Sequence, residues 1–366
     1  MNGAAGPPEP EPAPEPAPEP ASAPEPPAPA VESTRRLLGA SFDLLTRSSD
    51  DMRRASFHIG VIVLGTVGPL ALASFGVAVT AIHKTQREMH DLMVRGAGSW
   101  LGVLGSVAGI GLLVAAVESR TMASAILGGH FAGKPIAVHA ALARSRMVFW
   151  RVITAAIIVG IPVFIAQTAV NAVFVAVLGS HTDISLVSSA LVAAVVGAPF
   201  AYLLSGVVLG DVDPFEATRR SFRVFRARKS AAALVAVFET VAILLVYLGS
   251  GAGLDIALRV FHALGLGPDS GAAGLALVSV GIVAGVFALG TLIYTALAIS
   301  LAPQVVMFVG LTRATFGLDH VRPGGDSDPA IRRPGQRPFR WMTIPMLLGF
   351  IAGAGSLIGV LTLIIR

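Results

Sequence analysis

The segment Asp213-Pro-Phe-Glu-Ala-Thr-Arg-Arg-Ser-Phe-Arg-Val-Phe-Arg-Ala-Arg-Lys229 runs directly into an apolar stretch at residues 231–250. Asp213 is a good helix cap, Pro214 suits the first turn, and Glu216 stands three residues after the cap, as in a capping box. At 3.6 residues per turn the phenylalanines and the arginines fall into separate arcs. The sequence therefore predicts a basic amphipathic helix that leads into a membrane span.

The same pattern recurs earlier in the chain. Ala141, Arg144, Ser145, Val148 and Phe149 match Ala217, Arg220, Ser221, Val224 and Phe225 without a gap, and a weaker third copy begins at Ser41-Phe42. Self-similarity of this kind sets the architecture of a chain. We expect three units, each a basic helix followed by an apolar hairpin.

Composition places these units in a membrane. The 366-residue chain is 54% hydrophobic and only 13% charged, and its mean hydropathy is +0.74, whereas soluble domains carry about 25% charged residues. Seven apolar stretches are long enough to cross a hydrocarbon core of about 30 Å. They lie at residues 57–81, 98–117, 152–178, 185–209, 231–250, 272–299 and 342–364. The predicted fold is an all-α transmembrane bundle of about six to seven spans.

Four regions are expected. Residues 1–33 form a Pro/Glu/Ala-rich tail, in which 12 of the 24 prolines occur before residue 31, and such a composition cannot pack a core. Residues 34–320 form the six-span domain, 321–340 a basic linker, and 341–366 a terminal span. The tail serves as a spacer or as a docking segment for a partner.

Charge predicts the orientation. With a cytoplasmic N-terminus, 22 of the 27 Lys and Arg residues fall in inner segments, as the positive-inside rule requires. This count needs residues 271–312 to form one span, and we expect that span to be broken near Pro303, where a helix hydrogen bond is lost. The alternative of two spans stays open. We expect a multi-pass protein of the bacterial inner membrane.

The residues at 213–226, together with His139-Ala-Ala-Leu-Ala-Arg-Ser-Arg146 and Leu311-Thr-Arg-Ala-Thr-Phe-Gly-Leu-Asp319, resemble the repeated signature of the glycerophosphoryl diester phosphodiesterase membrane-domain family. The resemblance covers roughly residues 33–320. It implies a six-span bacterial membrane protein, sometimes fused to a phosphodiesterase. No soluble segment of this chain is long enough for that catalytic domain, so the resemblance implies the membrane part only.

Glu239 is the strongest single candidate for a functional residue, because it lies about 15 Å into the fifth span, where a carboxylate needs a partner. Gln167 and Asn171 share one face of the third span, and we expect their amides to supply that partner. No second acid lies inside the seven predicted stretches. Glu239 is either a relay or a hydrogen-bonded structural group.

The basic residues provide a second candidate site. Arg219, Arg220, Arg223, Arg226 and Arg144 are expected to contact anionic lipid or a partner protein, since cationic side chains are attracted to a charged leaflet. No aromatic stacking platform accompanies them, so nucleic acid is not an expected ligand. Pairs of glycines such as Gly281 and Gly285 allow close helix packing, within the chain or in a homo-oligomer.

No catalytic motif is visible. The chain has no cysteine, its eight histidines show no zinc-site spacing, and neither a phosphate loop nor a serine elbow occurs. We therefore expect no enzyme, metal or cofactor. Two functions remain: a membrane accessory or scaffold protein with lipid-binding basic helices, and a permease-like subunit that uses Glu239 and the proline-broken helices.

Overall fold

The computed structural model describes residues 34–82, 84–92, 94, 96, 98–178, 182–265 and 271–324. Every element that these residues form is helical, which confirms the all-α prediction. The tail at 1–33, most of the basic linker and the predicted span at 342–364 lie outside the described residues. The structural account below therefore concerns residues 34–324.

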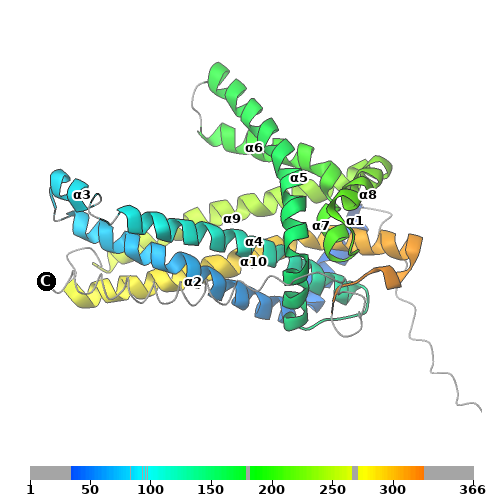
Figure 1. The fold of residues 1–366 in the computed structure, drawn as a ribbon, viewed down its shortest axis with the longest axis horizontal. Coiled ribbons are helices and arrows are strands. Elements are labelled where there is room, and N and C mark those ends of the chain that lie inside the picture. Colours follow the sequence, from blue (N-terminus) through cyan, green and yellow to red (C-terminus); the bar gives the residue numbers. More distant parts are fainter. Residues whose placement is uncertain are drawn as a thin grey trace, which may run out of the picture.

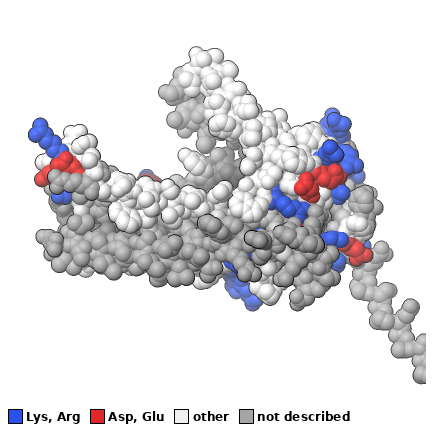
Figure 2. Space-filling model, in the orientation of Figure 1, with Lys and Arg blue, Asp and Glu red and all other residues white. Residues whose placement is uncertain are grey.

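Five helices in the described residues are long and apolar enough to cross a membrane. They are α2 (Ser49–Ile82), α4 (Gly98–Phe131), α5 (Val138–Leu178), α9 (Lys229–Ala263) and α10 (Gly271–Phe316). In Figure 2 the charged side chains of the described residues gather mainly towards the two ends, and the described surface between them shows little charge. This distribution suits a bilayer, whose core excludes charge.

The long helices form three antiparallel hairpins. The first pairs α2 with α4, the second pairs α5 with α6 (Thr182–Gly197), and the third pairs α9 with α10. Figure 1 shows α2, α4, α9 and α10 running side by side, while the α5–α6 hairpin rises away from them. Contacts between α4 and α5, α6 and α9, and α10 and α4 close a ring of five helices drawn from all three hairpins.

The predicted span at 185–209 is not one helix. It is divided into α6, a 3₁₀ turn η2 (Ala198–Phe200) and α7 (Leu203–Val208). Pro199 lies in η2, where it suits the start of a new helical turn and cannot extend α6. Proline therefore ends α6 and divides this arm of the second hairpin.

Pro303 behaves differently. It lies inside α10, which is a continuous helix of 46 residues. The prediction of one element at 271–312 is confirmed, but the predicted break near Pro303 is wrong. Buried neighbours on both sides, Ala302 and Val305, hold this part of α10 in the core, and helices at membrane depth tolerate proline when packing compensates the lost bond.

Short amphipathic helices precede two of the hairpins at one end of the bundle, called the basic end below. These are α1 (Thr34–Arg47) and α8 (Pro214–Ala227), which lie at the same end as the start of α5 (Figure 1). The other end carries α3 (Gln86–Leu92). Asp213 caps α8 as predicted, accepting a hydrogen bond from the Phe215 amide at 3.2 Å.

The aligned serines of the three predicted units have similar environments. Ser41, Ser145 and Ser221 are 3%, 0% and 0% exposed. Ser145 shares a hydrogen bond with Thr121 of α4, and Ser221 donates to the Pro199 carbonyl at 2.7 Å. All three serines therefore lie on the packed side of their helices, and Ser145 and Ser221 also bond to a neighbouring element, whereas Ser41 donates to the Leu37 carbonyl of its own helix.

A close helix crossing holds the first and third hairpins together. A Cβ atom at Gly290 of α10 would lie 2.8 Å from the Gly60 Cα of α2, so only glycine permits this approach. The predicted pair Gly281 and Gly285 does not make the crossing. Gly281 faces Phe261, and Gly285 faces open space.

Candidate functional site

A polar band interrupts α4 at Glu118, Ser119, Arg120 and Thr121. The preceding apolar stretch ends at Val117, and the sequence therefore suggested that α4 leaves the membrane there. Instead α4 continues to Phe131 and keeps this band within the bundle. Arg120 and Glu118 point to different neighbours, because residues two apart on a helix lie on nearly opposite sides.

Arg120 is the partner of Glu239. An Nη2 atom of Arg120 lies 2.9 Å from Oε1 of Glu239 on α9, with side chains 34% and 28% exposed. Glu239 is ten residues past the start of α9, about 15 Å along the helix. The pair therefore joins the first and third hairpins.

The predicted pairing of Glu239 with Gln167 and Asn171 is wrong. Gln167 donates to the Ser189 carbonyl of α6 at 3.1 Å, and the Ser189 hydroxyl donates to Asn171 Oδ1 at 3.1 Å. The two amides do share a face of α5, as expected, but that face packs against α6 in their own hairpin.

The Arg120–Glu239 pair lines a pocket of about 550 Å³ inside the five-helix ring. Its walls are mostly apolar and include Leu113, Val152, Val159, Val163 and Leu297. Gln304 of α10 also lines it. This side chain is only 3% exposed, and its Oε1 atom has no hydrogen-bond partner within the described residues.

The broken segment of the second hairpin supplies another wall. Gly197, Phe200, Ala201 and Leu203, which span the passage from α6 through η2 into α7, all line the pocket. Discontinuous helices beside a pocket are typical of membrane transport sites. The pocket therefore combines an apolar lining, a discontinuous helix, an ion pair and an orphaned carbonyl acceptor.

Glu118 is a buried acid of α4 that lies one residue past the predicted apolar stretch at 98–117. Its side chain is 0% exposed, and His58 of α2 and Arg146 of α5 flank its carboxylate at 3.8 Å and 3.9 Å. The sequence does contain a pattern that indicates this residue, because a Glu and an Arg two residues apart directly follow an apolar stretch. Glu118 was missed because the stretch was expected to end at Val117.

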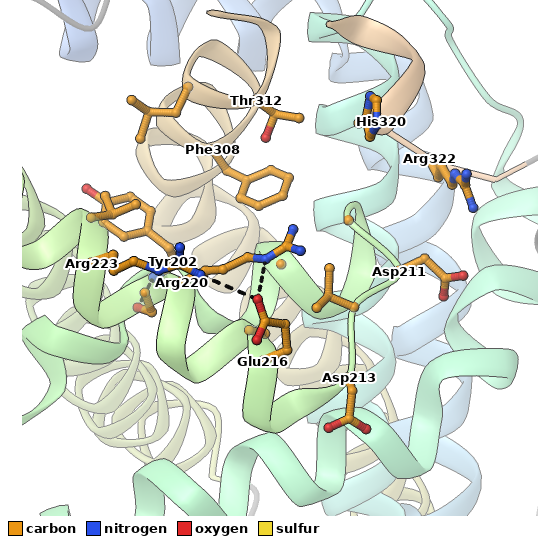
Figure 3. A pocket seen from close by; sticks show the side chains of 17 residues that line it. Tyr202, Asp211, Asp213, Glu216, Arg220, Arg223, Phe308, Thr312, His320 and Arg322 are labelled. Atoms are coloured by element: carbon orange, nitrogen blue, oxygen red, sulfur yellow. Dashed lines mark hydrogen bonds and ion pairs between the residues drawn. The ribbon is translucent and has the colours of Figure 1, made fainter. Parts of the chain in front are cut away.

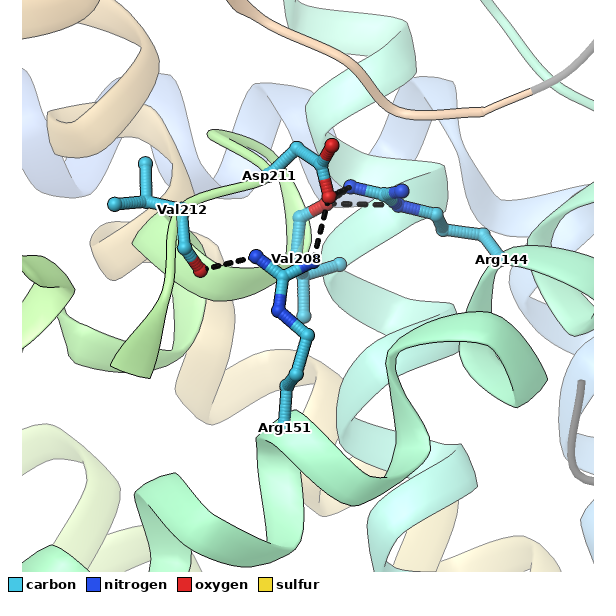
Figure 4. A network of polar contacts seen from close by, with 5 residues as sticks. All are labelled: Arg144, Arg151, Val208, Asp211 and Val212. Carbon is cyan, nitrogen blue, oxygen red and sulfur yellow. Dashed lines mark hydrogen bonds and ion pairs between the residues drawn. The ribbon is translucent and has the colours of Figure 1, made fainter. Parts of the chain in front are cut away.

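The prediction that Arg144 contacts lipid or a partner is also wrong. Arg144 is 1% exposed and donates from Nε and Nη2 to the Val208 carbonyl at 3.0 Å and 2.7 Å. Asp211, in the turn between α7 and α8, accepts from Arg144 at 3.4 Å and from Arg151 at 2.6 Å. Figure 4 shows both guanidinium groups converging on this carboxylate, so Arg144 and Arg151 fix the turn to α5.

On α8 the remaining predicted arginines are exposed. Arg219, Arg220, Arg223 and Arg226 all reach the surface. Arg220 and Arg223 bind Glu216 at 3.0 Å and 3.4 Å, so Glu216 does not complete the predicted capping box. The hydrogen bond from Arg220 is the main cause that lowers the pKa of Glu216 below its ordinary value.

A second pocket, of about 760 Å³, opens beside α8 at the basic end. Figure 3 shows Arg220, Arg223 and Glu216 on one wall and Phe308, Thr312, His320 and Arg322 on the others. Acids and bases both line it, so its charge does not select one ligand class. Within the described residues, no group of three or more His, Asp or Glu is arranged to hold a metal.

No protein-family model, curated protein or solved structure matches the chain. The resemblance of residues 213–226 to the phosphodiesterase membrane domain therefore stays a prediction.

Proposed function

We propose that the chain is a permease-like subunit that takes an amphiphilic molecule into the pocket between its three hairpins. This is the second of the two functions that the sequence suggested. The observation that carries it is the pocket itself, which reaches both members of the Arg120–Glu239 pair. A close-packed bundle around that pair would instead have favoured the scaffold.

The lining indicates the chemistry of the ligand. Binding pockets for small molecules combine apolar walls with a few convergent polar groups. Here apolar side chains surround Arg120, Glu239 and Gln304. A ligand with an apolar chain and a polar head would place the chain against α5 and α6 and the head near the ion pair.

Gln304 strengthens this assignment. A buried acceptor without a partner costs about 1–3 kcal/mol. A ligand that donates a hydrogen bond to Oε1 of Gln304 would remove this cost. The head group is therefore expected to carry at least one N–H or O–H donor, such as a hydroxyl or an ammonium group.

The proposed location is the bacterial inner membrane, with the basic end in the cytoplasm. The positive-inside rule supports this orientation, since α1, α8 and the start of α5 gather at one end (Figure 1). Solute entry would then occur from the bilayer or from the opposite face, between α5–α6 and the other helices. No catalysis is part of the proposal.

Native mass spectrometry of the protein purified in mild detergent tests the pocket. We expect one tightly bound amphiphile per chain, retained by the wild type and lost from Arg120→Gln and from Gln304→Leu. The matched control is Arg259→Gln on α9, because Arg259 forms an equivalent 2.9 Å pair with Asp255 but is 79% exposed. Equal occupancy in all three variants would refute the pocket as a binding site.

A second function is favoured by the surface of α8. Phe215, Arg219, Phe222 and Arg226 lie where the phenylalanine arc and the arginine arc of α8 meet, so they form one stripe. All four are exposed, Phe215 by 66%. Aromatic rings beside arginines suit the headgroup region of a bilayer. We propose that this stripe holds anionic lipid, or a membrane-protein partner or second copy that covers the same face.

The lipid version is tested with vesicles. In lipid bilayers, the preference of the embedded protein for anionic phosphatidylglycerol over neutral phosphatidylcholine should fall when Arg219 and Arg226 are both changed to Gln. Arg220→Gln is the control, since Arg220 already binds Glu216. An unchanged lipid preference in the double variant removes this function and leaves the pocket proposal intact.

A further inference from the structure

Glu118 is a carboxylate buried without hydrogen bonds. Its side chain is 0% exposed, and within the described residues neither of its oxygens has a hydrogen-bond partner. Burial of an ionised carboxylate is costly unless it is paired or hydrogen-bonded. The neighbours of Glu118 therefore decide its charge.

Two nitrogens approach the carboxylate from different hairpins. His58 Nε2 of α2 lies 3.8 Å from Oε2, and Arg146 Nε of α5 lies 3.9 Å from Oε1. Both nitrogens are themselves buried and lack a hydrogen-bond partner. These distances give strong electrostatic attraction but exceed hydrogen-bonding range by several tenths of an ångström.

The surroundings hold the three groups in place. Next to Glu118, Thr121 of α4 and Ser145 of α5 share a buried hydrogen bond that fixes where the two helices meet. The His58 and Arg146 side chains are 31% and 30% exposed, so each extends from the surface of the bundle towards the buried acid.

Other charged groups on the helices around α4 either have a partner of their own or are exposed, as Asp50, Arg53, Arg54 and His139 are. On α2, Asp51 binds His130 of α4 at 3.0 Å. On α5, Arg144 and Arg151 bind Asp211. Tyr294 of α10 donates to Met52 Sδ, and Arg120 of α4 itself faces Glu239. The described part of α7 has no titratable side chain, and on α1 Arg47 pairs with Asp43, while Arg35 and Arg36 are exposed.

We propose that His58, Glu118 and Arg146 form a proton-binding site, in which one exchangeable proton is held between the His58 imidazole and the Glu118 carboxylate. Without that proton, Arg146 neutralises Glu118 and His58 is uncharged. Uptake of one proton from water gives the cluster a net charge of +1, and its loss returns the proton to water. The proposal does not depend on a ligand in the pocket.

Nuclear magnetic resonance of histidine-labelled protein in nanodiscs tests the site. The imidazole signal of His58, assigned by its absence in His58→Gln, is followed between about pH 5 and 8, where histidines titrate. Glu118→Gln removes the negative charge that faces the imidazole and should change the pH dependence of the His58 signal. Arg146→Gln removes the competing cation and should change this pH dependence in the opposite sense.

The control uses the second histidine pair of the same helices. Asp51→Asn removes the 3.0 Å contact of His130 and should change the His130 signal while it leaves that of His58 unchanged. Arg146→Gln retains the acid and tests the proposal even if Glu118→Gln does not fold. The proposal is overturned if His58 does not titrate in this range, or if its midpoint is the same in the wild type and in Arg146→Gln.

Discussion

Replacing Asp211 by asparagine isolates the charge of the buried carboxylate that holds the α7–α8 turn. Asp211 is 4% exposed and accepts from Arg151 at 2.6 Å and from Arg144 at 3.4 Å. Its φ of +51° is in the left-handed region, which asparagine tolerates as well as aspartate does. The substitution therefore changes charge without adding backbone strain.

The size of the effect follows from burial. Removing one partner of a buried ion pair costs about 3–5 kcal/mol, because the remaining charge is left without compensation. Arg144 is 1% exposed, whereas Arg151 reaches water and the asparagine oxygen still accepts a hydrogen bond, so the lower end applies. We expect a loss of about 3 kcal/mol, roughly a hundredfold in the folding equilibrium.

Unfolding of the purified protein by increasing mole fractions of sodium dodecyl sulfate measures this loss. Asp255→Asn is the matched control, because Asp255 forms a 2.9 Å pair with Arg259 on an exposed helix surface, and such pairs contribute about 0–1 kcal/mol. If Asp211→Asn and Asp255→Asn unfold at the same detergent fraction, the reasoning about the buried network is refuted.

Three further outcomes are expected. Gly290→Ala should lower the same unfolding midpoint by about 1–3 kcal/mol through overpacking against α2, while Gly285→Ala, which faces open space on the same helix, should be neutral or slightly stabilising; equal effects would place the close crossing elsewhere. Glu239→Leu leaves Arg120 without its ion-pair partner, so Glu239→Leu with Arg120→Leu should be more stable than Glu239→Leu alone, and a double variant that is less stable would contradict the pairing. Glu216 should titrate below its ordinary pKa of 4.5 by nuclear magnetic resonance and shift upward in Arg220→Gln; because the folded-state pKa is lowered, its contribution to stability is present above pH 4.5 and is lost as the pH falls towards the folded value. An unshifted Glu216 in Arg220→Gln would show that the hydrogen bond is not the cause.

Composition was sufficient to predict the fold class, since a chain with so few charged residues can bury its backbone polar groups in lipid only as helices. The cap at Asp213 was also readable, because it depends on local backbone chemistry. Pro303 was not, since its neighbours in the core decide whether a proline interrupts a helix.

Which side chains form a site depends on where each helix ends and on how it is rotated about its axis, and the sequence predicts both poorly. Glu118 was missed because the estimated end of an apolar stretch was 14 residues short of the end of α4 at Phe131. The partner of Glu239 was assigned to α5, yet Gln167 faces α6 and Arg120 approaches from α4. The arrangement of the five-helix ring decides which helix lies beside α9, and no local sequence pattern predicts this arrangement.

Arg144 and Arg220 show a further limit. They occupy matching places in two similar segments, yet Arg144 is buried in an ion-pair network and Arg220 lies on the surface with Glu216. The difference arises from Asp211, which precedes one segment and packs against the other. A repeated motif therefore does not carry a repeated role.

Cryo-electron microscopy of the chain in lipid nanodiscs tests the central claim most directly. We predict an elongated density inside the five-helix ring, with its polar end in contact with Arg120, Glu239 and Gln304 and its apolar part along α5 and α6. A ring closed around the ion pair, with the α5–α6 hairpin packed flat against α4 and no room for a ligand, would contradict the account.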